Sequence, residues 1–268
     1  MDLWIGEDLE EKWRKKKGKN WIRDLKEAGC RILWYTSYRF DGGENPLLCI
    51  TDSAQEMRRV KDMGYPCICL ETGGYRIYGA DLVVENVEDI DFELCKGVYN
   101  RHYQIPSVIL ETERLIVRET VPEDAEQLYQ LYEEGNGTYL EPLPGKLQEE
   151  QRILSFYFQH IYGFYGYGMW SVIQKEDKRM VGRVGLENGE MDGKGILELG
   201  YLIGKAWQRR GYAFEAAKAV IQYAKENMGE EWLYLKAHRE NIPSIHLARK
   251  LGFDMIKEET LCWFRKRL

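Results

Sequence analysis

A strand that leads through a glycine-containing turn into a helix constrains this chain more than any other segment. Glu198 to Ile203 is a short apolar run with a glycine inside it, which predicts a buried strand with a bulge or a close backbone approach near Gly200. After the turn, apolar residues recur at the spacing of one helix face, at Phe214, Ala217, Val220, Ile221, Ala224 and Met228. The turn between these segments therefore opens a helix.

This turn contains the pattern Gln208-x-x-Gly211-x-Ala213, with Arg209 and Arg210 at the variable positions. The first N–H groups of a helix have no partner within the helix, and the helix dipole adds positive charge at the same end. Gly211 lets the backbone approach phosphate oxygens because it has no Cβ, and the two arginines add further charge. The turn predicts an anion site, although an ordinary helix start with two solvated arginines would show the same pattern.

The pattern resembles the central motif of the GNAT superfamily of acyl-CoA-dependent N-acyltransferases, Gln/Arg-x-x-Gly-x-Gly/Ala after the fourth strand. Residues 110–125 are similar to the opening strand and helix of the branch that contains ribosomal-protein N-terminal acetyltransferases. Asn241-Ile-Pro-Ser244 and Lys250-Leu-Gly-Phe253 are similar to the next coenzyme-binding motif of that branch. The resemblance implies an α/β (α+β) fold over residues 110–268, a GNAT-type mixed sheet flanked by helices.

The resemblance also implies acetyl-CoA as cosubstrate, with its pyrophosphate on the turn. Coenzyme contacts are then expected from the strand backbone, the turn, the helix start and the cap of the following helix. These residues are Tyr201, Leu202, Ile203, Gln208, Arg209, Arg210, Gly211, Tyr212, Ala213 and Asn241.

Acyl transfer needs a neutral amine, a group that accepts its proton and stabilisation of the oxyanion. Glu198 stands where several family members place a general base, but an exposed strand residue paired to a neighbour would fit the same position. The resemblance assigns the oxyanion to a backbone N–H between Tyr201 and Ile203. Many relatives protonate the departing thiolate with a tyrosine at the position of Ala248, so Ser244 becomes the nearest motif-matched hydroxyl. Its alternative role is a helix-start hydrogen bond beside Asn241.

Two function classes follow from this resemblance. The first is an acetyl-CoA-dependent N-acetyltransferase that acts on a peptide α-amine or a small-molecule amine by direct attack on the thioester. The second is a non-catalytic protein that binds acyl-CoA or a metabolite. The acceptor site is expected near the aromatic segment 156–168, where Tyr165 and Tyr167 stand between glycines. His160 lies within this aromatic segment. His246 is interpreted as a packing or surface residue, with a role near the thiol as the alternative.

Charge and hydropathy limit the partners. The net charge of −6 argues against a general affinity for nucleic acid. No apolar run approaches the ~20 residues of a membrane helix, and the first residues lack the basic and apolar regions of a signal peptide. We therefore expect a cytoplasmic protein without a membrane partner. The oligomeric state stays open, with a homodimer as one option.

The six cysteines stand at 30, 49, 67, 69, 95 and 262, several of them inside apolar strands. Buried reduced thiols are expected in a reducing compartment. Cys67 and Cys69 would share one strand face, but no histidine pair is near them in the sequence. No metal site is predicted.

The first 105 residues are predicted to form a separate unit, because Ile105-Pro-Ser interrupts the pattern between Tyr103 and Val108. Apolar strands alternate with helices there, which predicts a small α/β domain with a mainly parallel sheet. The expected strands are 30–36, 47–51, 66–70 and 81–85, and the expected helices are 7–28, 54–63 and 87–101.

Three segments of this unit resemble pieces of a haloacid dehalogenase-like core: 51–54, 64–68 and 79–84. That family carries an Asp-x-Asp nucleophile after its first strand, whereas strand 30–36 is followed by Ser37-Tyr-Arg. Asp89-Ile-Asp91 is predicted to start a helix instead. A non-catalytic role is therefore expected. The basic cluster Lys12–Lys19 predicts a solvated helix, with a phosphate or RNA contact as the alternative.

Overall fold

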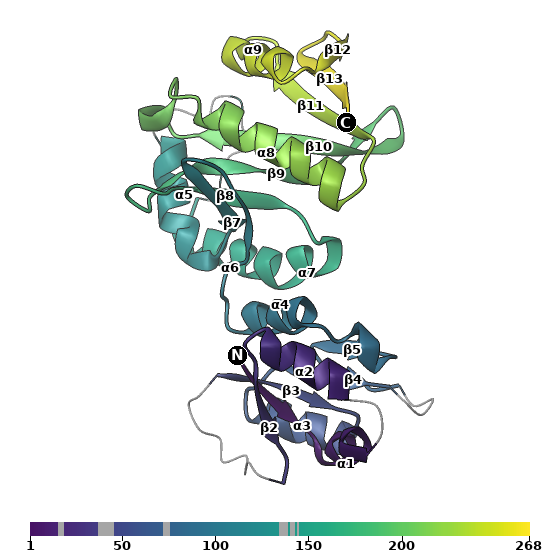
Figure 1. The fold of residues 1–268 in the computed structure, drawn as a ribbon. Helices are drawn as coiled ribbons and strands as arrows, with labels where there is room; N and C mark the ends of the chain where they lie inside the picture. Colours follow the sequence, from purple (N-terminus) through teal and green to yellow (C-terminus); the bar gives the residue numbers. More distant parts are fainter. Residues whose placement is uncertain (16–18, 37–45, 72–75, 134–138, 140–142, 144) are drawn as a thin grey trace. The chain divides into compact units, whose positions relative to one another are not determined.

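The computed structural model describes residues 1–15, 19–36, 46–71, 76–133, 139, 143 and 145–268. The chain divides into two compact units, Met1–Ile105 and Pro106–Leu268. Figure 1 shows that each unit has its own sheet with helices packed on it.

The first unit contains a five-stranded sheet in the order β2-β1-β3-β4-β5, and every strand pair in it is parallel. The strands are β1 (Asp2–Ile5), β2 (Arg31–Trp34), β3 (Leu47–Thr51), β4 (Cys67–Leu70) and β5 (Leu82–Val84). The helices are α1 (Glu7–Lys15), α2 (Lys19–Glu27), α3 (Ala54–Asp62) and α4 (Phe92–His102).

Both faces of this sheet are buried, because successive side chains of a strand point to opposite faces. Leu3 and Ile5 of β1 belong to the apolar cluster that includes Leu9 of α1, Leu25 of α2 and Cys95 of α4. Trp4 points to the opposite face, into the cluster with Met57 and Val60 of α3. The sheet is therefore sandwiched between helices, as short, nearly continuous apolar strands predict.

Two details of the first unit differ from the sequence prediction. The first strand is β1, which lies between β2 and β3, and the expected first strand 30–36 is the edge strand β2. The expected helix 7–28 is described as α1 and α2, with residues 16–18 outside the description. Residues 37–45 and the side chains of the Lys12–Lys19 cluster also lie outside it.

The start of α4 agrees with the prediction for the acidic segment 89–91. The Leu94 N–H donates to Oδ1 of Asp91 over 2.8 Å, so Asp91 caps the helix. The six cysteines are all buried and free, and the Sγ atoms of Cys67 and Cys69 lie 3.9 Å apart on one face of β4. No group of three or more metal-ligating side chains that could hold an ion is found within the described ranges.

The second unit contains an eight-stranded sheet in the order β12-β13-β11-β10-β9-β8-β7-β6. Its pairs are antiparallel except for β10 with β11. The strands are β6 (Val108–Glu111), β7 (Leu115–Glu119), β8 (Met169–Gln174), β9 (Met180–Met191), β10 (Lys194–Ile203), β11 (Trp232–His238), β12 (Asp254–Lys257) and β13 (Leu261–Arg267). This mixed sheet, preceded by the parallel sheet, confirms the predicted fold class.

Helices flank both faces of the mixed sheet. They are α5 (Ala125–Glu133), α6 (Leu147–Phe156), α7 (Tyr162–Tyr165), α8 (Tyr212–Asn227) and α9 (Ile242–Lys250). Trp170 and Val172 of β8 face the α8 side, where Trp170 meets Tyr223 edge-on. Ile173 faces the other side and packs with Leu128 of α5. Within the described residues, no helix is long and apolar enough to cross a membrane.

Candidate active site

The mixed sheet opens between its two central parallel strands. β10 pairs with β9 along its whole length, from Lys194 opposite Met191 to Ile203 opposite Gly182. With β11 it shares one register position, Glu198 opposite Tyr234. Beyond Glu198 the two strands no longer pair, so the edge of β10 from Leu199 to Ile203 faces an opening in the sheet.

The backbone of β10 supplies hydrogen-bond donors to this opening. The N–H of Gly204 donates to the Val181 carbonyl of β9 over 2.9 Å. Donors in an antiparallel strand alternate between its two edges, so the N–H groups of Ile203 and Tyr201 point away from β9. The side-chain amide of Gln208 supports this direction, since it donates to the Ile203 carbonyl over 3.0 Å.

The same alternation corrects one prediction for the strand and decides between the alternatives of another. The N–H of Leu202 points toward β9, and its side chain is buried, so Leu202 has no donor for a ligand in the opening. The pairing of β9 with β10 shows no register shift, so it contains no bulge at Gly200. Of the two alternatives predicted near Gly200, the structure shows the close approach, because a Cβ there would lie 3.0 Å from Sδ of Met169.

The predicted anion turn follows β10 directly. Arg209 and Gly211 adopt positive φ angles of 60° and 84°, and α8 begins at Tyr212. The side chains of Arg209 and Arg210 are exposed, and Lys205 precedes them in the same connection. Backbone N–H groups of the first turn of α8, including those of Tyr212 and Ala213, are available to an anion. The ring of Tyr212 is buried in the core.

A residue that sequence reasoning did not select holds this turn in place. Arg114, before β7, donates to the Arg210 carbonyl over 3.0 Å and stacks on the Tyr212 ring at 4.5 Å. Its guanidinium also pairs with Glu215 in the first turn of α8. Burial alone would raise the pKa of Glu215, but hydrogen bonds from Thr112 and Arg114 outweigh it and lower that pKa.

Glu198 lies at the point where β10 and β11 separate. Its side chain is buried, and Lys236 Nζ of β11 lies 3.0 Å from its Oε2. A Cβ on Gly189 would overlap the Glu198 carboxylate, so the glycine leaves room for this side chain. Glu187, directly opposite on β9, is exposed on the same face. Two carboxylates therefore border the opening on the side away from α8.

The start of α9 approaches the opening on the α8 side. Asn241 caps α9, and its Oδ1 accepts the Ser244 N–H over 3.3 Å. The Tyr201 hydroxyl lies 2.8 Å from Ser244 Oγ, and burial raises the pKa of Tyr201 to about 12. Ala248, in place of the family tyrosine, is fully buried. His246 is exposed on α9.

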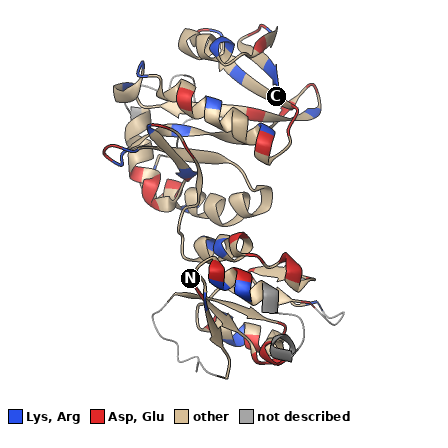
Figure 2. Cartoon of the chain, in the orientation of Figure 1, with Lys and Arg blue, Asp and Glu red and all other residues tan. Residues whose placement is uncertain are grey.

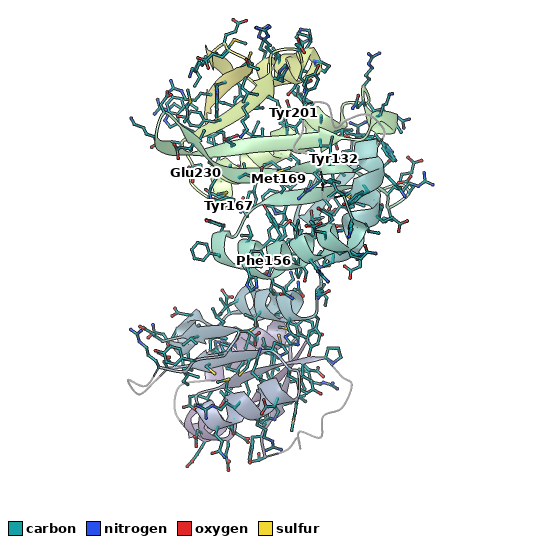
Figure 3. All side chains as sticks on the ribbon, turned by 180° about the vertical axis from the view of Figure 1, so that it is seen from behind. Tyr132, Phe156, Tyr167, Met169, Tyr201 and Glu230 are labelled. Carbon is teal, nitrogen blue, oxygen red and sulfur yellow. The ribbon has the colours of Figure 1, made fainter. Side chains whose placement is uncertain are left out.

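The aromatic segment fixes the start of β8 beside the opening. The Met169 N–H donates to the Tyr157 hydroxyl over 3.0 Å, and the Tyr162 hydroxyl donates to the Met169 carbonyl over 2.5 Å. Tyr167 donates to Asn188 of β9 over 2.7 Å, whereas Tyr165 is exposed. Tyr167 packs against the core that contains residues of α8, whereas Met169 follows the opposite face because Trp170 points to the α8 side; Figure 3 labels both residues. His160 is exposed next to Phe156, with their rings 4.7 Å apart.

Comparison with known proteins gives the family. Residues 114–254, more than half of the chain, match the acetyltransferase (GNAT) domain. The chain belongs to the GNAT acetyltransferase family. Its relatives include the uncharacterized N-acetyltransferase YjdG of Bacillus subtilis, 30% identical over 91 residues. That match covers 34% of this chain and 54% of YjdG, so the chain spans about half the length of that relative.

Two further comparisons agree with this membership. The [ribosomal protein uS5]-alanine N-acetyltransferase of Escherichia coli is 27% identical over 160 residues, which cover 56% of this chain and 80% of that protein. The structure of RimL, a ribosomal L7/L12 α-N-protein acetyltransferase in complex with coenzyme A, has a TM-score of 0.52 at 15% identity. It covers 60% of this chain and 98% of RimL, and at that identity it shows the fold alone.

The family match confirms the GNAT resemblance of the C-terminal part, the class of N-acetyltransferases and acetyl-CoA as the coenzyme of this family. It begins at Arg114, so the haloacid dehalogenase-like resemblance of residues 1–105 stays a prediction. The geometry brings the predicted strand, turn, Glu198 and Ser244 around one opening in the sheet.

Proposed function

We propose that the chain is an acetyl-CoA-dependent N-acetyltransferase whose acceptor is a peptide α-amine or a small-molecule amine. The observation that carries this proposal is the opening of the sheet beyond Glu198, which continues directly into the anion turn at Gly211. One elongated ligand with an anionic end could lie along β10 and reach both parts.

The coenzyme would be held by backbone groups and by the arginines of the turn. The N–H groups of Tyr201 and Ile203 would bind the extended arm as a neighbouring strand would, and Gly211, Tyr212 and Ala213 would bind the pyrophosphate. Arg209 and Arg210 would add charge, while Gln208 and Asn241 would hold the turn and the start of α9. The backbone N–H groups and the two arginines fit an anionic ligand because each of them is a hydrogen-bond donor or a cation.

The reaction would proceed by attack of a neutral amine on the thioester carbon. An α-amino group with a pKa of about 7.7–8.0 is roughly a tenth to a fifth neutral at pH 7, whereas a lysine amine is neutral to about 0.04%. Glu198 would accept the amine proton as the new C–N bond forms. A N–H of the Tyr201–Ile203 strand would stabilise the oxyanion.

The C–S bond then breaks, and the thiolate takes up a proton. Ser244 would donate this proton and take one up from solvent afterwards, while the Tyr201 hydroxyl, 2.8 Å from Ser244 Oγ, would hold its side chain in place. A thiol has a pKa of about 8.5, so a thiolate leaves readily near neutral pH and this acid contributes less than the base.

A calorimetric titration of acetyl-CoA into the full-length protein tests the coenzyme site first. We expect micromolar binding at one site per chain. Turnover is then measured across a panel of peptide and small amines, where Glu198→Gln should lower kcat/KM by about 10²–10³-fold without weakening coenzyme binding. Glu187→Gln is the matched control, because it removes the facing carboxylate of β9.

Three outcomes would change this assignment. Absence of acetyl-CoA binding would reduce the resemblance to one of fold. Tight binding without turnover on any amine would favour the second function class, a non-catalytic acyl-CoA sensor. A loss of activity in Glu187→Gln but not in Glu198→Gln would move the base to β9.

A further inference from the structure

One face of the strands β11 and β13 carries aromatic and cationic side chains in alternation with the buried core. Leu233, Leu235 and Phe264 point into the core that contains residues of α8 and α9. The side chains of the opposite face are Trp232, Tyr234 and Lys236 of β11 and Trp263, Arg265 and Arg267 of β13. We name these six residues the β11–β13 face. All six are exposed or half-buried.

The cations of this face stack on its indole rings. The guanidinium of Arg265 lies 4.4 Å from the centroid of the Trp232 ring, and that of Arg267 lies 5.8 Å from it. Lys236 Nζ lies 5.9 Å from the Trp263 ring. Stacking restricts the side chain of an arginine but leaves the N–H donors in the plane of its guanidinium open to an anion.

Arg265 and Arg267 differ from Lys236 in their ionic contacts. Within the described residues, neither guanidinium has a carboxylate oxygen within 4.0 Å, whereas Lys236 pairs with Glu198 at 3.0 Å. A pair of oriented, unneutralised guanidiniums on an exposed sheet surface is suited to carboxylates, which arginine binds in bidentate fashion. Figure 2 shows that Lys and Arg residues lie along β13 near the C-terminus.

The face adjoins the opening at Glu198. Glu198 lies opposite Tyr234, and Tyr234 lies opposite Arg265, so these residues form one row across three neighbouring strands. Since adjacent strands are about 4.8 Å apart, the backbones of Glu198 and Arg265 are separated by about 10 Å. Carboxylates therefore border the row at β9 and β10, and guanidiniums border it at β13.

We infer that the β11–β13 face binds acidic side chains of a peptide acceptor, a few residues after the amine that is acetylated. This inference rests on the proposed function. A cationic amine would lie beside the carboxylates of Glu198 and Glu187, and an extended peptide, at about 3.3 Å per residue, covers 10 Å in about three residues. Carboxylates at about the third to fifth residue of the acceptor would then meet Arg265 and Arg267.

The surroundings of the face favour an acidic peptide over RNA. Glu230 and Glu231 directly precede Trp232, so two carboxylates stand next to the face in the sequence. A nucleic acid carries a phosphate at every residue, so it would bring phosphates against these carboxylates as well as against Glu187. A peptide can place its carboxylates only where the guanidiniums are.

The experiment compares two fluorescent peptides in the presence of saturating coenzyme A. One is Ala-Ala-Asp-Glu-Asp with a carboxy-terminal dye, and the other is its amide analogue Ala-Ala-Asn-Gln-Asn. We expect the wild-type protein to bind the acidic peptide about 10-fold more tightly, and the Arg265→Gln/Arg267→Gln variant to bind both peptides within 2-fold of each other. Lys266→Gln should keep the wild-type preference.

Lys266 is a matched control because it stands between the two arginines on the opposite face of β13. Its Nζ lies 2.8 Å from the position that a Cβ on Gly252 would occupy, on the α9 side. Raising the salt from 50 to 300 mM should reduce the preference of the wild-type protein for the acidic peptide, since exposed ion pairs are screened. This measurement needs no variant, so a variant that fails to fold does not decide the test.

Four results separate the inference from the proposed function. Equal binding of both peptides by the wild-type protein would overturn the inference, whatever the turnover. Weaker acetyl-CoA binding in the double arginine variant would overturn it too, because the face would then serve the coenzyme. Tighter binding of a single-stranded RNA probe than of the acidic peptide would overturn the choice of partner. Arginine-dependent peptide binding without any acetylation would support the inference and contradict the proposed function.

Discussion

The two sheets of this protein differ at the ends of their interior strands, because one of these ends is filled by a side chain and the other is open. In the parallel sheet, the order β2-β1-β3 puts a switch point beside the end of β1, where doubly wound sheets commonly bind ligands. Glu56 of α3 occupies this place, since it accepts hydrogen bonds from the Glu7 N–H at 3.0 Å and the Thr51 hydroxyl at 2.5 Å. In the mixed sheet, β10 separates from β11 and keeps its N–H groups at Tyr201 and Ile203 open.

The difference shows that an opening in a sheet becomes a ligand site only where the chain leaves it unfilled. A Cβ on Gly6 would overlap the Glu56 carboxylate and Thr51, so the glycine serves the packing of the chain against itself. At Gly211 the nearest atom to an added Cβ is Arg114 Nη2 at 3.5 Å, so that glycine faces open space. Gly6 and Gly211 each follow a strand at a possible ligand site, but only Gly211 faces open space. A substitution at Gly6 should therefore affect packing, and one at Gly211 should affect ligand binding.

The largest effect is expected at the turn after β10, where the mixed sheet is open. Gly211→Glu adds bulk, a backbone strain at a φ of 84° and a negative charge where the pyrophosphate would lie. We expect acetyl-CoA affinity to fall more than 100-fold, which corresponds to about 3 kcal/mol. Calorimetry measures it. Gly193→Glu is the control, because Gly193 has a similar φ of 76° with no atom within 4 Å of its Cβ position. Unchanged affinity in Gly211→Glu would refute the site.

A smaller effect is expected at the end of β1, which the Glu56 side chain fills. Gly6→Ala should destabilise the first unit by about 2 kcal/mol, because the added methyl group has no room beside Glu56 and Thr51. Hydrogen exchange of the β1 segment measures this loss. Gly97→Ala, at an exposed helical glycine with open space around it, should instead stabilise by up to about 1 kcal/mol. A large loss of acetyl-CoA affinity in Gly6→Ala would contradict the assignment of coenzyme binding to the second unit.

The stability that the ion pair between Arg114 and Glu215 gives to the start of α8 should depend on pH. Glu215→Gln removes the charged acceptor of Arg114 and Thr112, and we expect it to destabilise the start of α8 by about 1–2 kcal/mol at pH 7. The folded protein lowers the pKa of Glu215, so its contribution is complete above the ordinary value near 4.3 and is lost as the pH falls through the lowered value.

Hydrogen exchange in α8 between pH 7 and pH 3 measures this difference. The gap between the wild-type protein and Glu215→Gln should narrow as the pH falls below about 5. Glu226→Gln, at an exposed position further along α8, should stay within about 0.5 kcal/mol of the wild-type protein at every pH. A gap that widens toward acid would contradict the role of the ionised carboxylate.

Local features of both sheets could be predicted from the sequence, whereas features that depend on strand pairing could not. The strand, turn and helix at 198–228 are local, so periodicity and a glycine pattern were enough to place them. Asn241, which caps α9, was selected through the family resemblance. β1 was missed, although β2 and β4 are equally short and were predicted; its pairing with β2 and β3 is what shows it to be a strand.

Long-range contacts were equally invisible in the sequence. Arg114 and Glu215 are 101 residues apart, and no spacing rule connects them. The stacking of Arg265 on Trp232 depends on the register of β11 with β13. Glu198 and Ser244 could be chosen from motifs, but the hydrogen bond from β10 to α9 through Tyr201 required the fold.

The smallest effect is expected for this last contact, Tyr201→Phe. The substitution removes the hydrogen bonds of the Tyr201 hydroxyl with Oγ and the carbonyl of Ser244, and it should destabilise the second unit by about 1 kcal/mol. The pKa of Tyr201 is raised to about 12 by burial, so its hydroxyl stays protonated across the range from pH 6 to pH 9. The pH profile of kcat/KM should therefore keep its shape in Tyr201→Phe while its height falls a few-fold. A limb of that profile that disappears in the variant would show that Tyr201 itself titrates during the reaction, and the opening would then hold an ionisable group beyond Glu198.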